Sequence, residues 1–152
     1  MGVALIAVRA PGGSCDGSID PATQAGLTAL VELAAELCGA RGALLWVNDA
    51  SGPRLLAQAG IPTEETPEQL AQATAHVRAE APAAADGLAG APLRASDGQV
   101  IGGLCVHDPS PRTSASPLPG LARQAAALLA LDRRLAAHLR SEQAARADAA
   151  HL

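Results

Sequence analysis

The stretch LAGAPLRASDGQVIGGLCVHD, residues 88–108, carries the clearest fold signal in the chain. Two apolar runs, 88–94 and 99–107, flank Ser96-Asp97-Gly98, a combination of residues typical of tight turns. The segment 100–106 is apolar on both faces, as expected for a central strand that is covered on two sides. The stretch therefore predicts a β-hairpin whose second strand lies inside a sheet.

A second hairpin is expected earlier in the chain. Two short apolar runs, 43–47 and 55–57, are separated by the turn-forming residues 48–53. A short helix with a thin apolar face should then begin at the capping-box pattern of residues 66–69 and end before Pro82. This helix would connect the two hairpins.

Two longer helices are expected outside the hairpins. The first lies between Asp20-Pro21, an N-cap followed by a first-turn proline, and Gly39, which supplies a stop. The last begins at Ser116-Pro117 and runs close to the end of the chain. This order predicts an α+β domain with an antiparallel sheet flanked by helices. We expect an N-terminal arm over residues 1–18, the domain over 19–139 and a projecting helix end over 140–152.

The composition limits both the core and the ligands. A chain of 152 residues favours one domain, and only 32 of them are Leu, Ile or Val, whereas 37 are Ala. With one Trp and no Tyr or Phe, a pocket that stacks a haem, flavin, bilin or nucleobase on aromatic rings is disfavoured. The net charge of −4, without a basic stripe, argues against nucleic-acid binding. We expect no cofactor.

The cysteines and the first residues indicate the compartment. Cys15, Cys38 and Cys105 are widely spaced, without a CxxC pair or neighbouring histidines, so neither disulfides nor a metal site is expected. Cys38 belongs to the apolar face of the first helix and is expected to be buried there. The apolar residues 2–9 are too few to span a bilayer and lack a positive leader. We therefore expect a cytoplasmic protein without a signal peptide or membrane segment.

Residues 89–112 resemble the closing hairpin of a bacterial GAF domain. The shared pattern is AG-PL, then the DG turn, then IG-LCV-D and the final PR, all present here in order. The Asn48-Asp49 turn and the stretch 59–67 are similar to the same family, so the likeness covers roughly residues 20–139. GAF sensor domains of this type precede histidine kinases and diguanylate cyclases. The resemblance implies a sheet with terminal helices on one face and a ligand pocket on the other.

The resemblance also implies which residues would line that pocket. Only 21 residues separate Pro67 from Ala89, where such domains usually carry a longer segment with an extra strand and a pocket-covering helix. Gly87-Leu88 stand where aromatic residues are usual. These departures imply a pocket that is small, open or vestigial. The implied lining residues are Trp46, Leu56, His76, Leu88, Ala91 and Leu104.

The chemically active side chains have ordinary structural interpretations. His76 is expected on the exposed side of its helix, with a contact to a polar ligand as the alternative. His107-Asp108 follow the central strand, where turn chemistry is expected and metal binding or proton transfer is the alternative. Trp46 is expected in the sheet core or on the floor of a cavity. Cys105, the one nucleophile candidate, lies among core residues with no visible cation or helix N-terminus to lower its pKa.

The sequence favours a non-enzymatic GAF-like sensory or regulatory domain. It would either bind a small ligand weakly or serve as a dimerisation and relay element for an output domain such as a histidine kinase or diguanylate cyclase. The alternative is a thiol-based enzyme or redox switch resembling the free methionine sulfoxide reductases that share the fold, although their cysteine and aromatic-glycine signatures are not recognisable. We assign no catalytic residue. The last helix, helped by the first, predicts a homodimer through Leu128, Leu131, Leu135 and Leu139.

Overall fold

The computed structural model of this chain describes residues 19–78, 87–110 and 117–150. The predicted N-terminal arm, residues 1–18, lies outside the described residues. In chain order the elements are α1 (Pro21–Leu37), β1 (Gly42–Asp49), β2 (Gly52–Ala59), the 3-10 helix η4 (Thr63–Glu65), α2 (Thr66–Arg78), β3 (Leu88–Arg94), β4 (Val100–His107) and α3 (Pro117–Ala150).

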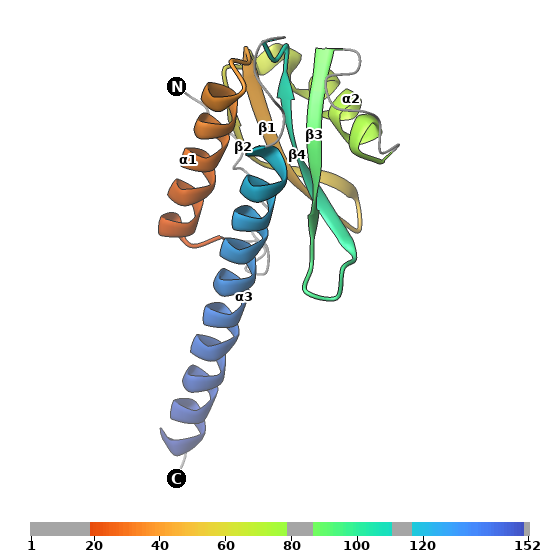
Figure 1. Cartoon of the computed structure of the whole chain (residues 1–152). Helices are drawn as coiled ribbons and strands as arrows, with labels where there is room; N and C mark the ends of the chain where they lie inside the picture. The colour runs from red at the N-terminus through yellow and green to blue at the C-terminus, as the bar shows by residue number, and fades with distance from the viewer. Residues whose placement is uncertain (1–18, 79–86, 111–116, 151–152) are drawn as a thin grey trace.

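The strands form one four-stranded antiparallel sheet in the order β2-β1-β4-β3. β1 and β4 are the central strands, and Leu45 lies opposite Leu104 in their register. Helices α1 and α3 lie side by side on one face of the sheet and α2 covers the other (Figure 1). The expected α+β architecture is therefore confirmed, and β4 is covered on two sides as its sequence predicts.

The two hairpins differ in how closely they match the predicted limits. β3 and β4 begin and end within one residue of the expected positions. β1 and β2 are longer than the expected runs 43–47 and 55–57, because their ladder continues to the pair Asp49 and Gly52. The Ser51 amide donates a hydrogen bond to the Asp49 carboxylate (2.8 Å), which stabilises the resulting short turn.

Alternation along the strands divides the core into two layers. On β1, Ala43, Leu45 and Val47 face α1 and α3, whereas Leu44 and Trp46 face α2. We call these the α1/α3 layer and the α2 layer. The α1/α3 layer is the larger, and its large buried side chains include Leu27, Val31, Leu56, Leu93, Leu104, Val106, Leu118, Leu121 and Leu129.

Helix α1 begins where the sequence predicts. The Asp20 carboxylate accepts a hydrogen bond from the Ala22 amide (3.0 Å) and Pro21 occupies the first turn. The Asp20 amide donates to Asp132 Oδ1 (3.1 Å), which ties the start of α1 to the middle of α3. At the other end Gly39 has a φ of 59°, the left-handed conformation that commonly ends a helix.

Helix α2 begins differently from the prediction. The 3-10 turn η4 runs directly into α2, so Thr66 lies within the helical segment rather than at an N-cap. Its hydroxyl is 3.0 Å from both Gln58 Oε1 and the Pro62 carbonyl oxygen, either of which can accept its proton. The capping box expected at residues 66–69 is therefore wrong, because the preceding turn already supplies the first helical hydrogen bond.

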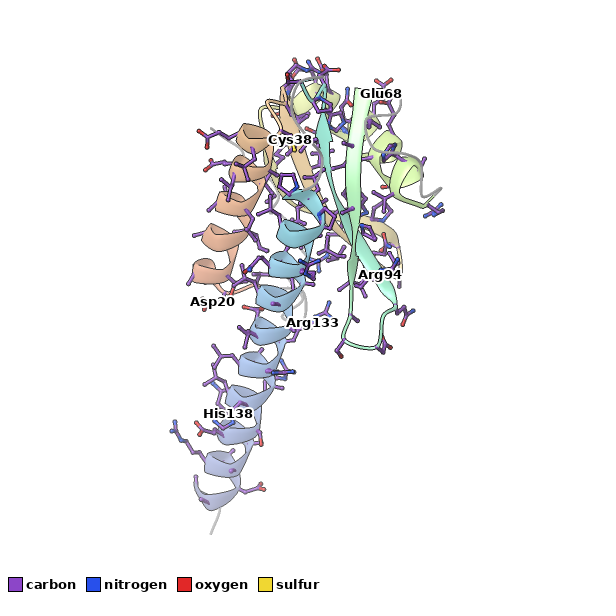
Figure 2. All side chains as sticks on the ribbon, viewed as in Figure 1. Asp20, Cys38, Glu68, Arg94, Arg133 and His138 are labelled. Carbon is purple, nitrogen blue, oxygen red and sulfur yellow. The ribbon has the colours of Figure 1, made fainter. Side chains whose placement is uncertain are left out.

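Helix α3 continues well past the edge of the sheet (Figure 1). Its first half is anchored by buried side chains from Leu118 to Leu129. In Figure 2, His138 lies on the projecting part, beyond the level of Asp20 at the start of α1. No helix in the described part of the chain is long and apolar enough to cross a bilayer. The exposed fractions of the leucines along the later part of α3 are 58% for Leu131, 52% for Leu135 and 48% for Leu139.

Candidate functional site

The α2 layer occupies the face on which the sequence resemblance implies a ligand. Helix α2 contributes little to it, because Ala73 and His76 are the buried residues of that helix and Leu70 and Val77 are partly buried. Most of the layer comes from the sheet. Its buried apolar members are Leu44, Trp46, Ile61, Ala73, Leu88 and Cys105.

Trp46 fills the space between the sheet and α2. The side chain is 1% exposed and lies opposite Gly103 in the register of β1 and β4. A Cβ atom placed on Gly103 would lie 2.5 Å from Trp46 Cζ2, so the indole ring rests directly on the glycine backbone. Gly90 makes room in the same way for α2, because a Cβ there would lie 3.1 Å from Val77 Cγ2. Trp46 is thus a core residue of this layer.

The buried polar side chains of the described residues, Gln58, His76 and His107, all lie on the α2 side of the sheet. Gln58 lies opposite Leu44 in the β1–β2 register and accepts a hydrogen bond from the first residue of α2. His107 follows Cys105 by two positions on β4, so both point to the same side of the sheet. The burial of Gln58 was not predicted from the sequence, because it depends on the cross-strand partner of this residue.

Both histidines correct an expectation. His76 was expected on the exposed side of its helix, yet it is 8% exposed and its Nε2 has no hydrogen-bond partner among the described residues. The reason is that it lies three residues after Ala73, on the helix face that contacts the sheet. His107 was expected at the end of the central strand with an ordinary turn-forming role, yet it is 3% exposed and neither ring nitrogen has a hydrogen-bond partner in the described part.

An ionic cluster borders His107 at the end of β4. The Arg41 amide donates to the His107 carbonyl (2.8 Å), and the Arg41 guanidinium pairs with Asp108 (3.2 Å) and Glu65 (3.9 Å). Burial lowers the pKa of His107 and the charge of Arg41 lowers it further, whereas Asp108 and the backbone of Gln69 act in the opposite direction. His107 is therefore a neutral ring near pH 7. No group of three or more metal-ligating side chains occurs within the described residues.

The sheet separates the six side chains that were predicted to line one pocket. A single pocket cannot contain them all, because β-strand alternation and a bulge between Leu45 and Trp46 send them to opposite faces. Ligand binding in the α2 layer stays a prediction for the residues on that side. Trp46, His76 and Leu88 lie on the α2 side, whereas Leu56, Ala91 and Leu104 lie in the α1/α3 layer.

The cysteines of the described residues are buried, one in each layer. Cys38 lies in the α1/α3 layer and Cys105 in the α2 layer. Burial raises the pKa of the Cys105 thiol to about 12 and also raises the pKa of the Cys38 thiol. Because the thiolate is the reactive form, Cys105 is unreactive near neutral pH. This environment favours a core role over a catalytic one.

Thiol labelling at pH 7 should be slow at both buried positions. Because each thiol is protonated and enclosed, we expect Cys38 and Cys105 to react at least about a hundredfold more slowly than in urea-unfolded protein. Peptide mapping after a timed reaction measures each site separately. Cys15 lies in a Gly- and Ser-rich stretch of the sequence and is expected to be exposed, so its labelling reports on reagent quality. Rapid native labelling of Cys105 would reverse the assignment and favour the thiol enzyme.

One antiparallel sheet between a pair of terminal helices and a short opposite helix defines a class of small α+β domains. Within that class, the profile of the GAF domain matches residues 23–139. The chain belongs to the GAF domain family, which confirms the resemblance seen in residues 89–112. GAF domains occur in sensor proteins, which supports a sensory role in signal transduction for this chain.

Solved structures agree with this assignment. The second GAF domain of DevS from Mycobacterium smegmatis is 29% identical, with a TM-score of 0.50 over 76% of this chain and 99% of that one. The GAF domain of a protein described as a sensor histidine kinase from Pseudomonas syringae pv. tomato has a TM-score of 0.55 at 20% identity, over 78% of this chain and 82% of that one. The GAF domain from Acinetobacter phosphoenolpyruvate-protein phosphotransferase has a TM-score of 0.52 at 18% identity, over 78% of this chain and 87% of that one. No curated protein matches the sequence.

Proposed function

We propose that this GAF domain is a non-enzymatic regulatory module that pairs with a second copy through α3 and relays a signal to an output domain. The observation that carries the proposal is the exposure of Leu131, Leu135 and Leu139 on the later part of α3. Each fully buried leucine contributes roughly 1.5–3 kcal/mol, so pairing of two helices would stabilise the assembly. Paired exit helices can pass on a rotation or a shift of register.

The apolar surface continues onto α1 and supports a part for that helix in the dimer. Leu128 precedes the exposed leucines on the same side of α3, and its Cδ1 lies 3.3 Å from where a Cβ on Gly26 of α1 would be. Leu33 and Leu37 of α1 are exposed. Leu37 and the outer side of residues 117–127 border a shallow hollow of about 360 Å³. Together these features form the outer α1/α3 face.

Replacing Leu135 and Leu139 together with glutamate should convert the dimer into folded monomers. Four carboxylates would then meet in the paired interface, where burial of an unpaired charge is costly. The exposed positions of these leucines make the monomer fold insensitive to the change. Sedimentation equilibrium measures the mass, and circular dichroism measures the fold.

The matched control is the pair Ala130→Glu and Ala137→Glu. These exposed alanines lie on the opposite side of α3 and receive the same added charge, so the dimer should persist. If the unchanged protein is a monomer at high micromolar concentration, the interface is wrong and the leucines have another partner.

The proposal includes an output domain and a compartment. A histidine kinase or a diguanylate cyclase is the proposed partner, supported by the similar GAF domain of a protein described as a sensor histidine kinase. A cytoplasmic location is proposed because Cys105 is a buried free thiol, as expected in a reducing compartment. Co-purification with a separately tagged, co-expressed output domain tests the partnership.

A second candidate function is weak binding of a small polar ligand in the α2 layer. The supporting observation is the buried His76 Nε2 without a hydrogen-bond partner among the described residues, a group that a ligand could satisfy. Equilibrium binding across a metabolite library tests this function, with His76→Leu as the variant that should lose the interaction. If the protein forms a dimer and no metabolite binds, the relay role remains and the ligand-binding function is rejected.

A further inference from the structure

Helix α2 is held to the sheet by few apolar contacts. Of its 13 residues, Ala73 and His76 are buried and Leu70 and Val77 are partly buried. The opposite face is covered by two longer helices that share a larger buried cluster. Because apolar burial supplies most of the docking free energy, α2 can open at a lower cost than the rest of the domain.

His107 lies beneath α2, and neither of its ring nitrogens makes a hydrogen bond within the described residues. It is 3% exposed, neither nitrogen has a partner among the described residues, and the backbone of Gln69 on α2 is near enough to influence its charge. Its cross-strand neighbours are Leu88 on β3 and Gly42 on β1, which carry no charge. A proton on this ring would create a buried charge, and the Gln69 backbone and Asp108 compensate only part of the cost of that burial.

The surrounding charges do not offset that cost. Arg41 repels a protonated His107, and the attraction of Asp108 is weakened because its carboxylate is largely exposed and pairs with Arg41. Burial is the largest cause of the lowered pKa of His107, ahead of both charges. The other titratable or charged groups on η4, α2 and the α2 side of β4 are Glu64, Glu65, Glu68, His76, Arg78 and Cys105.

We propose that protonation of His107 in mildly acidic solution releases α2 from the sheet and opens the α2 layer. The open state takes up the proton at the ordinary histidine pKa of 6.5, whereas the pKa in the closed state is lower. The closed state therefore loses stability as the pH falls below 6.5, and the loss continues until the pH reaches the lowered pKa. Below the lowered pKa, the ratio of open to closed molecules is higher by about tenfold for each pH unit that separates the two pKa values of His107.

The layer contains two natural reporters of this opening. Trp46 is the single tryptophan of the chain and no Tyr or Phe accompanies it, so intrinsic fluorescence reports on the α2 layer. Cys105 lies in the same layer, whereas Cys38 lies on the α1 side of the sheet and serves as an internal control (Figure 2). Local release of α2 exposes Trp46 and Cys105 and leaves Cys38 protected.

The experiment follows the full chain, carrying Cys15→Ser, from about pH 7.5 to about pH 5, where histidine titrates. The thiol reagent is 4,4′-dithiodipyridine, and each rate is divided by that of urea-unfolded protein at the same pH. We expect a reversible red shift of the Trp46 emission and a rise in the relative labelling of Cys105 as the pH falls below 6.5. Relative labelling of Cys38 should not change.

His107→Gln and His107→Leu should abolish the pH dependence, because neither side chain takes up a proton in this range. His76→Gln is the matched control on α2 and should retain it. The proposal is overturned if protection of Cys105 is independent of pH, if Cys38 loses protection in parallel, or if the dependence survives in the His107 variants. Should neither variant fold, the comparison of Cys105 with Cys38 in the wild-type chain decides.

Discussion

Replacing Gly103 with alanine should lower the free energy of unfolding by about 1–3 kcal/mol. The added methyl group would lie 2.5 Å from Trp46 Cζ2 and 2.7 Å from Cη2, closer than van der Waals contact allows. The ring cannot move aside easily, because it is 1% exposed and packs in one cluster with Leu44 and Cys105. Urea-induced unfolding, followed by circular dichroism, measures the loss.

Two further variants isolate the clash from the general effect of changing a glycine. Gly120→Ala in α3 should be neutral or stabilising, because its Cβ would meet no atom closer than 3.7 Å and alanine favours a helix. In a Trp46→Leu background, Gly103→Ala should cost less, with an interaction free energy of about 0.5–3 kcal/mol. Strictly additive costs would show that Trp46 is not the residue that requires a glycine at this position.

Leu129→Ala and Leu131→Ala should differ strongly although the two residues are neighbours on α3. Leu129 is 5% exposed in the α1/α3 layer, and its truncation should cost about 2–5 kcal/mol. Leu131 is 58% exposed, and its truncation should change the stability of the monomer by no more than about 0.5 kcal/mol. Thermal or urea unfolding at low protein concentration measures both values.

Raising the protein concentration separates the two roles of α3. If α3 pairs with a second copy, Leu131→Ala should become destabilising at high concentration, because the folded dimer is favoured by mass action. Leu129→Ala should be destabilising at every concentration. Equal effects of both variants in dilute solution would mean that the helix is rotated relative to the sheet.

The α2 layer shows why the candidate site was harder to predict than the fold. Local sequence places His76 on a helix and His107 at the end of a strand, and both are found there. Their burial depends on which side of α2 packs against the sheet. That side is hard to predict from the sequence, because the apolar face of α2 is thin. Gln58 was missed for a related reason, since a cross-strand partner buries it.

The β-bulge between Leu45 and Trp46 had a similar effect on the predicted pocket. It changes the register of β2, and Leu56 joins the α1/α3 layer together with the adjacent Ala57. A strict alternation of inward and outward residues cannot anticipate this, because a bulge is set by pairing between strands. Leu56 consequently lies in the α1/α3 layer, whereas Ala91 and Leu104 lie there through ordinary strand alternation opposite Leu45.

The sequence by itself determined the elements whose signals are local: the closing hairpin of residues 88–107, the start of α1 at Asp20 and the long α3. Turn glycines, caps and helical periodicity act within a few residues, so they can be read from neighbouring positions. Tertiary structure decided which side chains share a layer. Burial of His76 and His107, the contact of Trp46 with Gly103 and the exposure of the α3 leucines all depend on packing between elements that are distant in the chain.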